Sequence, residues 1–537
     1  MHLRPTCVPL MAMVLFFTLV NAVAPVVDVS YSKYRGKGLG NGVTHWLGMR
    51  YAAPPLGDLR FMPPPRPSRS RQAKNANKFR LKCVSQSAKA RFIGKSQSED
   101  CLFLNVFAPS NASRHAKLPV FVYIQGGGFN DNSRPKINGA DLIRALDMKM
   151  VVVTLNYRVS VLGFLSYGDK VQPNNGLLDQ RKALQWVQKY ISRFGGNPRH
   201  VVLGGSSSGG ASVAFHLTAY GGRDDKLFHA AAAESISTSP IKTVEQASYQ
   251  AESFIENVGC SSEDAIACMR TKTIAKIIAA SINVPYPGGT RLPIGMWGPV
   301  VDGDFVQDAL WSSFDQGKSV KVPSIIGATT NEGRAFAPAA SSKTEVEDFF
   351  KAEFPLLEST HMTQITALYP GLADTCSKAG CLKQPLSDAY GDMRFQCSGI
   401  SFSESISRWI PKKTWNYWYN VEDPGFMAQG RGVAHCDEAH AIWGPGNGGS
   451  GAPRSYFPGG INANAVNVVQ GYWISFIRSY NPNKYRLADT AMWGVYSKAS
   501  RRRLVFNTGG RTSLESMTLD LQDKYTYFNS IAATVQQ

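Results

Sequence analysis

Charged residues are scarce in this 537-residue chain, at 18%, whereas soluble globular domains average about 25%. Acidic residues are the scarcer kind: 39 Asp and Glu stand against 58 Lys and Arg, which gives a formal net charge of +19 at pH 7. The hydrophobic share of 43% excludes intrinsic disorder, because disordered chains lack the apolar surface that offsets the entropy of ordering. The positive excess is typical of proteins that bind nucleic acids or anionic surfaces.

Three other features are missing from the sequence. No cysteine and histidine residues have the spacing of a zinc site, so we expect no metal centre. Internal repeats and low-complexity tracts are absent, which excludes repeat architectures. No nucleic-acid-binding motif is present, which disfavours nucleic acid as the partner of the positive charge. The length permits two or three domains, or one large α/β domain with insertions.

The N-terminus carries the one long apolar run, over residues 8–20. Arg4 precedes this run, and small residues follow it at Ala22 and Ala24. The pattern predicts a secretory signal peptide over residues 1–22, cleaved after Ala22 or Ala24. A membrane-spanning helix is disfavoured, because the run is shorter than the roughly 20 residues that cross a bilayer. No later stretch is long and apolar enough to span a membrane.

The cysteines agree with export. Nine are present, and Cys7 leaves with the signal peptide. The remaining even number in an oxidising compartment predicts up to four disulfides, whose connectivity the spacing leaves open. These eight are Cys83, Cys101, Cys260, Cys268, Cys376, Cys381, Cys397 and Cys436. Asn111 begins the only N-x-S/T sequon, which predicts a glycosylated surface loop.

Strand and helix patterns alternate along the chain. Buried strands are expected over residues 120–125, 150–156, 201–204, 230–234, 324–328 and 415–419, and helices over 179–194 and 209–219. Such alternation predicts an α/β fold with a mostly parallel sheet that is covered by helices on both faces. The glycine-rich stretch 446–451 is too short for an interdomain linker, so we expect one domain over residues 25–537.

A G-x-S-x-G motif follows one of these strands. Its sequence is Gly205-Ser206-Ser207-Ser208-Gly209, and a helical pattern follows it. A strand, this motif and a helix form the setting of a nucleophile elbow, where the central serine is exposed on a sharp turn. Ser207 is therefore the predicted nucleophile, with Ser206 and Ser208 as competitors. A plain glycine and serine turn is the alternative.

Three consecutive glycines end an earlier strand, in Gln125-Gly126-Gly127-Gly128-Phe129. Without Cβ atoms, such backbone lets N–H groups approach a substrate oxygen and form an oxyanion hole. A phosphate-binding loop is the rival interpretation. It is disfavoured because no Gly-Lys-Ser/Thr follows.

A base must follow the nucleophile in an α/β-hydrolase, and the acid lies between the two. The histidines after Ser207 are His216, His229, His361, His435 and His440. His435, in a loop-like GVAHCDE segment, is the predicted base, and His440 is its competitor. Glu332 follows the strand at 324–328 and is the predicted acid. The alternatives Asp302 and Asp304 are more typical of turn residues.

These ordered motifs, together with the segments RYA at 50–52, EDCLFLNV at 99–106 and NYR at 156–158, carry a resemblance. The sequence resembles the type B carboxylesterase/lipase family, the cholinesterase-like α/β-hydrolases, and most resembles their secreted fungal members. The resemblance runs over about residues 48–506. It implies an α/β-hydrolase fold with large insertions and no metal or organic cofactor.

By position, the resemblance also implies functional residues: a triad of Ser207, Glu332 and His435, and an oxyanion hole from the N–H groups of Gly127, Gly128 and Ser208. It implies the disulfides Cys83–Cys101 and Cys260–Cys268, and a structural ion pair between Glu99 and Arg158. The other four cysteines have no secure counterpart. Cys376–Cys381 would close a small loop, and Cys397–Cys436 would fix the loop of His435.

Two departures from the family stand close to these residues. Ser206 occupies a position where the family commonly has Glu, so we expect a carboxylate near the triad to be missing. Gln125 stands where His is common. Neither departure removes a triad role, although the first is expected to alter the pH profile or charge preference.

The expected function is that of a secreted carboxylic ester hydrolase acting through an acyl-enzyme. Small or medium soluble esters, or a secondary-metabolite ester, are the expected substrates. Only 17 residues separate Cys83 from Cys101, where lipases of this family carry a lid, and none is the Trp that a choline substrate would require. The alternatives are a true lipase acting on long-chain esters and a non-catalytic adhesion protein that binds surfaces.

The positive charge is concentrated in one run. From Arg60 to Lys95 the chain has eleven Lys and Arg and no Asp or Glu. A solvated basic face is the plain interpretation of such a run. Contact with an acidic polysaccharide or a cell wall is the functional alternative.

Overall fold

The computed structural model describes residues 25–537 apart from 262, 374–375, 377 and 450. The predicted signal peptide and its cleavage site therefore lie outside the described residues. In the described part of the chain, no helix is both long and apolar enough to cross a membrane.

An eleven-stranded sheet forms the centre of the molecule, in the order β16-β15-β14-β13-β12-β11-β9-β10-β8-β4-β3. Neighbouring strands from β10 through β15 are parallel, and antiparallel pairs close both edges. The strands are β3 (Lys37–Gly38), β4 (Val43–Arg50), β8 (Phe103–Pro109), β9 (Leu118–Ile124), β10 (Val151–Leu155), β11 (Gly196–Ser206), β12 (Ala230–Glu234), β13 (Ser324–Thr329), β14 (Thr414–Asn420), β15 (Arg502–Asn507) and β16 (Arg511–Ser516).

Two small sheets flank this centre. One contains β1 (Val26–Asp28), β2 (Lys33–Arg35) and β5 (Ala73–Asn75), in the order β1-β2-β5. The other pairs β6 (Lys82–Cys83) with β7 (Gln97–Ser98). All six predicted strands are present in the large sheet, whereas its antiparallel edge strands were not predicted.

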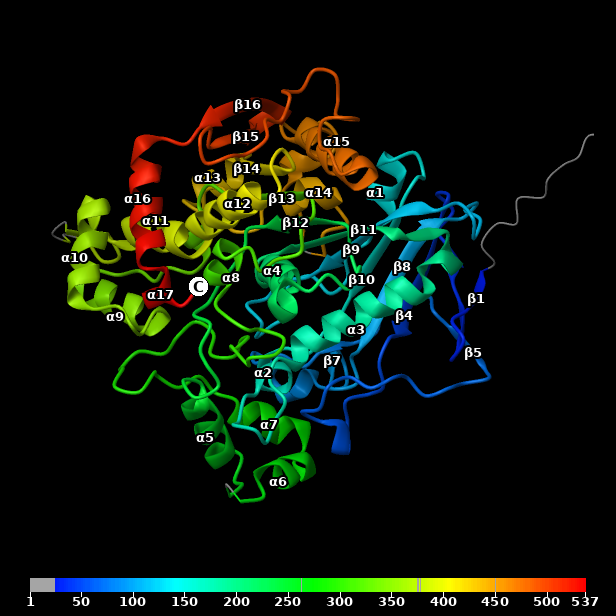
Figure 1. Ribbon diagram of the computed structural model, residues 1–537, viewed down its shortest axis with the longest axis horizontal. Helices are drawn as coiled ribbons and strands as arrows, with labels where there is room; N and C mark the ends of the chain where they lie inside the picture. Colours follow the sequence, from blue (N-terminus) through cyan, green and yellow to red (C-terminus); the bar gives the residue numbers. More distant parts are fainter. Residues whose placement is uncertain (1–24, 262, 374–375, 377, 450) are drawn as a thin grey trace, which may run out of the picture.

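Helices cover both faces of the large sheet, as predicted (Figure 1). They are α1 (Ala140–Ala145), α2 (Ser160–Phe164), α3 (Asn175–Tyr190), α4 (Ser208–Gly222), α5 (Ser248–Asn257), α6 (Ala265–Thr271), α7 (Ile274–Ala280), α8 (Leu310–Asp315), α9 (Lys343–Glu353), α10 (Ser359–Leu368), α11 (Lys383–Gly391), α12 (Cys397–Trp409), α13 (Pro424–Ala428), α14 (Ala439–Trp443), α15 (Ala463–Ser479), α16 (Leu519–Ser530) and α17 (Ala532–Val535). A π-helical turn (Asp392–Gln396) joins α11 to α12.

The strand β9 shows how the sequence divides the core. Its side chains alternate between the two faces, as strand geometry requires. Val120 and Val122 pack in the same cluster as residues of α3 and α4, whereas Phe121 and Tyr123 pack in the cluster of α1 and α15. A third cluster joins α9, α10, α11, α12 and α16, at one end of the molecule. The fold class predicted from the sequence is confirmed.

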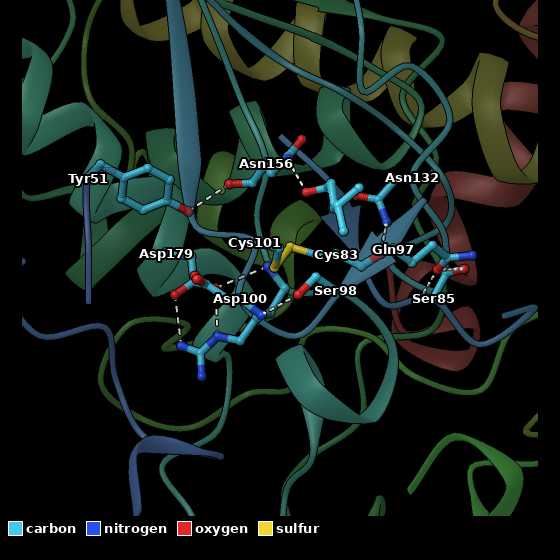
Figure 2. Close-up of a disulfide and its surroundings, with 12 residues drawn as sticks. Tyr51, Cys83, Ser85, Gln97, Ser98, Asp100, Cys101, Asn132, Asn156 and Asp179 are labelled. Carbon is cyan, nitrogen blue, oxygen red and sulfur yellow. Dashed lines mark hydrogen bonds and ion pairs between the residues drawn. A yellow bond between two sulfur atoms is a disulfide. The ribbon is translucent and has the colours of Figure 1, made fainter. Parts of the chain in front are cut away.

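Three disulfides are formed, Cys83–Cys101, Cys260–Cys268 and Cys376–Cys381. The first joins the β6 region to the start of β8, and Figure 2 shows it beside Asp100 and Asp179. Cys397 and Cys436 are both free and buried, so the expected Cys397–Cys436 bond is wrong. Cys397 lies in the third core cluster, whereas the thiol of Cys436 lies against Ser206.

The expected ion pair between Glu99 and Arg158 is also wrong, because each residue has another partner. Glu99 binds Arg60 at 2.5 Å, and Arg60 donates further to the carbonyl of Met269 at 2.9 Å. Arg158 binds Asp179 at 2.7 Å, and its backbone N–H also donates to that carboxylate. Arg60 is thus a buried, paired residue rather than part of a solvated basic face.

We expect Asp179→Asn to lower the free energy of unfolding by about 3–5 kcal/mol, because it leaves the Arg158 guanidinium buried without a counter-charge. Denaturant unfolding of the two proteins measures the difference. Glu347→Gln is the matched control: Glu347 pairs at 3.7 Å with the exposed Lys343, and its loss should cost under about 0.5 kcal/mol. Equal small effects of both substitutions would contradict the importance of the buried pair.

Candidate active site

Ser207 lies on the turn between β11 and α4. Its backbone has φ 59° and ψ −128°, a conformation that is uncommon for a residue with a side chain and that stores strain. The turn is fixed on both sides, because the Ser207 N–H donates to the Glu234 carbonyl at 3.0 Å and the Ser207 carbonyl accepts from Ser237 N–H at 3.2 Å. The G-x-S-x-G motif thus has the strand, turn and helix that the sequence predicted.

Gly209 allows the first turn of α4 to pack against the end of β9. A Cβ at this position would lie 2.1 Å from the carbonyl oxygen of Ile124, the last residue of β9. Such a distance is impossible for real atoms, so glycine is required. The close approach sets the nucleophile turn directly beside the backbone that follows β9.

That following backbone is the glycine loop, Gly126 to Gly128. A Cβ on Gly127, whose φ is 127°, would lie 2.0 Å from the carbonyl oxygen of Asp131. The N–H groups of Gly127 and Gly128 have no acceptor among the described residues. Ser208 is the first residue of α4, at the positive end of the helix dipole.

Gln125 holds the glycine loop from behind. Its buried side chain accepts from Arg134 N–H at 3.0 Å and donates to Asn132 at 3.3 Å and to Asn156 at 3.4 Å. Gln125 therefore supports the glycine loop and is not a group that contacts substrate.

The first disulfide loop braces the glycine loop as well. Gln86 N–H donates to the Asn130 carbonyl at 3.0 Å, and Ser87 donates to the Asp131 carboxylate at 2.6 Å. The Asn132 amide donates to the carbonyl of Cys83 at 3.0 Å (Figure 2). The short segment between Cys83 and Cys101 is consequently tied to the loop that follows β9.

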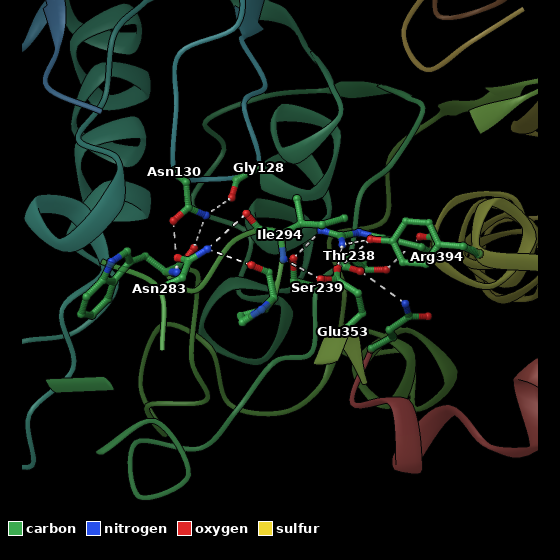
Figure 3. Close-up of polar contacts among 12 residues, drawn as sticks. Gly128, Asn130, Thr238, Ser239, Asn283, Ile294, Glu353 and Arg394 are labelled. Carbon is green, nitrogen blue, oxygen red and sulfur yellow. Dashed lines mark hydrogen bonds and ion pairs between the residues drawn. The ribbon is translucent and has the colours of Figure 1, made fainter. Parts of the chain in front are cut away.

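A long irregular segment, residues 281–300, is tied to the other side of this loop. Asn130 donates to the carbonyls of Gly128 at 2.6 Å and Trp297 at 2.8 Å. Ile294 N–H donates to Glu353 at 2.6 Å, and Glu353 in turn binds Arg394 at 2.7 Å (Figure 3). These contacts link the glycine loop to α9 and to the π-helical turn.

His435 and Glu332 come from neighbouring loops after β14 and β13. Their side chains meet at 2.5 Å between Nδ1 of His435 and Oε2 of Glu332. The two loops are joined by the bridge between Asn331 and Ala434 and by the Asn331 N–H, which donates to the Val433 carbonyl at 2.8 Å. The other oxygen of Glu332 accepts from Thr329 N–H at 2.7 Å, so this buried carboxylate is fully oriented.

The His435 ring also packs against two aromatic rings, with centroid distances of 5.1 Å to Phe336 and 4.6 Å to Phe395. Phe395 belongs to the π-helical turn, a type of irregularity that is frequent at functional sites. Since Nδ1 is engaged by Glu332, Nε2 is the remaining ring nitrogen. This buried atom has no hydrogen-bond partner in the described part of the chain.

One cavity of about 380 Å³ brings these groups together. Ser207, His435, Gly127 and Gly128 all line it, although they come from three separate segments. A strained serine, a histidine oriented by a carboxylate, and unpaired backbone donors are the parts that acyl transfer requires.

The competing residues have other roles. Ser206 is buried and accepts from Tyr123 at 2.8 Å, and Ser208 is fully buried. His216 is buried beside Gln180, and burial lowers the pKa of His216 and of His440 to about 3.

The remaining competitors serve local structure. His361 caps α10. His229 lines no part of the cavity, and burial lowers its pKa. Asp302 accepts from the N–H groups of Asp304 and Val306 and is a turn residue, as expected.

The position before the nucleophile carries no carboxylate, since it is Ser206, but Glu438 supplies one near the triad from another segment. Its buried side chain accepts from Ser235 at 2.7 Å and from Tyr417 at 3.1 Å. Burial and then repulsion from Glu332 raise the pKa of Glu438 to about 7. Glu234, at the end of β12, is buried as well, and burial followed by repulsion from Glu438 raises its pKa. Sequence reasoning missed both, although Glu438 lies three residues after His435.

Asn111 is exposed in the turn after β8. Among the described residues, no group of three or more His, Cys, Asp and Glu is placed to hold a metal ion.

Comparisons with known proteins agree on one family. The model of the carboxylesterase family matches residues 23–524. A cholinesterase of Mus musculus is 30% identical over 508 residues. The alignment covers 88% of this chain and 80% of the cholinesterase. Secreted lipase 4 of Gibberella zeae is 28% identical, covering 86% and 83%. The crystal structure of EstA of Aspergillus niger has a TM-score of 0.91 and 39% identity, and covers 96% of this chain and 99% of its own.

The raised pKa of Glu438 predicts how stability depends on pH. The folded state holds a proton on this carboxyl up to pH 7, whereas the unfolded state releases it near pH 4.5. Stability is therefore lost as pH rises between these values, by an amount of order 3 kcal/mol. Glu438→Gln, which stays neutral, should flatten the fall in unfolding free energy between pH 5 and pH 8.

Denaturant unfolding across this pH range measures the effect. Glu347→Gln, on the partly exposed face of α9, should keep the slope of the original protein. Part of the slope should remain in Glu438→Gln, because burial also raises the pKa of Asp392 and of Asp437 to about 6. An unchanged slope in Glu438→Gln would mean that Glu438 is ionised in the folded protein.

Proposed function

Because the chain belongs to the carboxylesterase family, and is a carboxylic ester hydrolase with the α/β-hydrolase fold, we propose that Ser207, His435 and Glu332 are its catalytic triad. One observation carries the proposal. The nucleophile turn, and a histidine held 2.5 Å from a buried carboxylate, open onto one cavity beside unpaired backbone N–H groups.

The mechanism begins with proton transfer. Nε2 of His435 accepts the Ser207 hydroxyl proton as the Oγ attacks the ester carbonyl. The carbonyl oxygen becomes an oxyanion and accepts hydrogen bonds from the N–H groups of Gly127, Gly128 and Ser208. Glu332 fixes the ring through Nδ1 and stabilises the imidazolium. The donors are already in place, so little reorganisation accompanies the charge.

The intermediate then collapses. The C–O bond to the alcohol breaks, the alcohol leaves with the proton from His435, and the acyl group remains on Ser207. A water molecule gives its proton to His435 and attacks the acyl-enzyme, which releases the acid and restores the Ser207 hydroxyl.

Small or medium soluble esters are the proposed substrates. The cavity of about 380 Å³ is near the lower end of the roughly 300–1,000 Å³ range of small-molecule sites. The segment between Cys83 and Cys101 is short and tied to the glycine loop, which leaves little chain for a mobile cover. A lipase acting on long-chain esters is the second candidate, because a lipase is among the relatives.

Secretion is also proposed. The chain forms three disulfides, which persist in oxidising compartments, and a secreted lipase is among its relatives. The N-terminal apolar run and the exposed Asn111 sequon support the same compartment.

We expect Ser207→Ala to lower kcat for p-nitrophenyl acetate by roughly 10⁴-fold or more, because no neighbouring hydroxyl can replace the nucleophile. Steady-state hydrolysis measures the loss. Ser206→Ala is the matched control and should keep activity within about tenfold, since Ser206 is buried against Tyr123. A variant Ser207→Ala with normal activity would refute the triad, as would loss of activity only in Ser206→Ala.

A series of p-nitrophenyl esters of increasing acyl length tests the substrate class. We expect kcat/KM to peak at short or medium chains and to fall beyond them, because a longer acyl chain exceeds the cavity. Monomeric esters below their solubility limit and dispersed esters above it are compared. A steep rise in rate only above the solubility limit would instead identify a lipase.

A further inference from the structure

A second cavity, of about 270 Å³, lies between the loop after β1 and one face of α3. It shares no lining residue with the cavity of Ser207 and His435. Cations and aromatic rings dominate its lining, which includes no acidic side chain. Nothing in the proposed ester hydrolysis uses these residues.

Four cations stand around this cavity. Arg66 and Arg69 come from the extended segment before β5, and Lys182 and Lys189 come from α3. The two lysines are seven residues apart, so they lie on one helix face two turns apart. Arg66, Arg69 and Lys189 are exposed, and Lys182 is half-buried.

No acidic group neutralises these four. None of them forms an ion pair with any described residue. The nearby carboxylates are engaged elsewhere: Asp28 accepts from Ser30 N–H, and Asp179 binds Arg158. Burial and repulsion from Arg66 lower the pKa of Lys182. Holding these four positive charges close together costs free energy because they repel one another. A bound anionic ligand would offset this cost.

The floor of the cavity is aromatic and rigid. The polar atoms of its rings are already paired: Trp186 donates to Tyr31 at 2.8 Å, Tyr190 is hydrogen-bonded to Ser30 at 2.9 Å, and Tyr51 donates to the Asn156 carbonyl at 2.7 Å. With these atoms engaged, the part of these largely buried rings that lines the cavity is carbon surface. The matching ligand therefore combines an apolar ring face with negative charge at its edge.

We propose that this cavity binds an acidic polysaccharide, whose sugar rings carry carboxylate or sulfate groups. A sugar ring presents C–H faces to the aromatic floor, while its anionic group meets the guanidinium and ammonium groups. At 270 Å³ the cavity holds a short stretch of such a chain. The neighbouring units would follow exposed cations such as Arg71 and Lys74, which lie just before and on β5 in the same small sheet as β1.

Polysaccharide is favoured over nucleic acid by the disulfides. Three of them indicate an oxidising, extracellular compartment, where the abundant polyanions are polysaccharides. The inference also differs from attraction by net charge, because it assigns binding to a defined set of side chains around one cavity.

The experiment measures binding of the full chain to immobilised polygalacturonate, to dextran sulfate and to neutral dextran. The double variants Arg66→Gln/Arg69→Gln and Lys182→Gln/Lys189→Gln remove lining cations. The matched control, Arg91→Gln/Lys95→Gln, removes two exposed cations from the same basic run but outside the lining. Each of the three double variants loses two positive charges.

We expect each lining variant to bind one or both acidic polymers at least about tenfold more weakly, and the control within about threefold of the original protein. Binding should weaken as salt is added, and neutral dextran should not bind. Hydrolysis of p-nitrophenyl acetate should be unchanged in all three double variants, which shows that these proteins are folded. Ser207→Ala should bind as the original protein does, so failure of the triad and failure of this site are distinguishable.

Four outcomes would overturn the proposal. They are absence of binding to both acidic polymers, equal binding of neutral dextran, equal losses in the lining and control variants, and tighter binding of a duplex DNA than of either polysaccharide at the same salt concentration. The third outcome would indicate diffuse attraction by net charge, and the fourth a nucleic-acid site.

Discussion

The contact between the first turn of α4 and the end of β9 is the constraint on which the site depends. The carbonyl of Ile124 fills the space where residue 209 would carry a Cβ, so the two backbones can meet only at glycine. This contact places Ser207 beside the loop that supplies Gly127 and Gly128. The order of strands also brings the glycine loop and the nucleophile turn together, because β9 and β11 are parallel neighbours whose carboxyl ends meet at one edge of the sheet.

Behind the triad, the protein concentrates acidic groups in a region of low dielectric. Glu332, Glu438 and Glu234 come from three different elements and are all buried. Burial, and then repulsion from a neighbouring carboxylate, raises the pKa of Glu438 and of Glu234, whereas Glu332 is held by the Thr329 N–H and by His435. The carboxylate that touches the imidazole is thus the one whose other oxygen accepts from a backbone N–H.

Much of this arrangement could be predicted from local sequence. Apolar, β-branched runs such as VFVYIQ and SIIGAT predict strands directly. The G-x-S-x-G motif can be identified as a nucleophile elbow from its flanking strand and helix alone. The strands β15 and β16 were missed because they mix charged with apolar residues, as expected of β16, which has one partner and an exposed face.

Pairings between distant segments could not be predicted in the same way. Arg158 pairs with Asp179, 21 residues away, and Arg60 with Glu99, because tertiary packing decides which carboxylate lies in reach. The same limit hid Glu438, whose importance comes from the approach of two loops at Asn331 and Ala434. It also explains the wrong prediction of a Cys397–Cys436 disulfide. Two cysteines that remain after the other pairings are assigned need not lie close together in the fold.

The bracing of the glycine loop by the first disulfide segment has a consequence for maturation. Three hydrogen bonds join the segment after Cys83 to residues 130–132, directly beyond the backbone donors of the cavity. The Cys83–Cys101 disulfide anchors that segment covalently to the start of β8, so reduction would remove one of the restraints on it. The support of these donors is thereby coupled to the redox state of the surroundings, because the disulfide that anchors the segment persists only in an oxidising compartment.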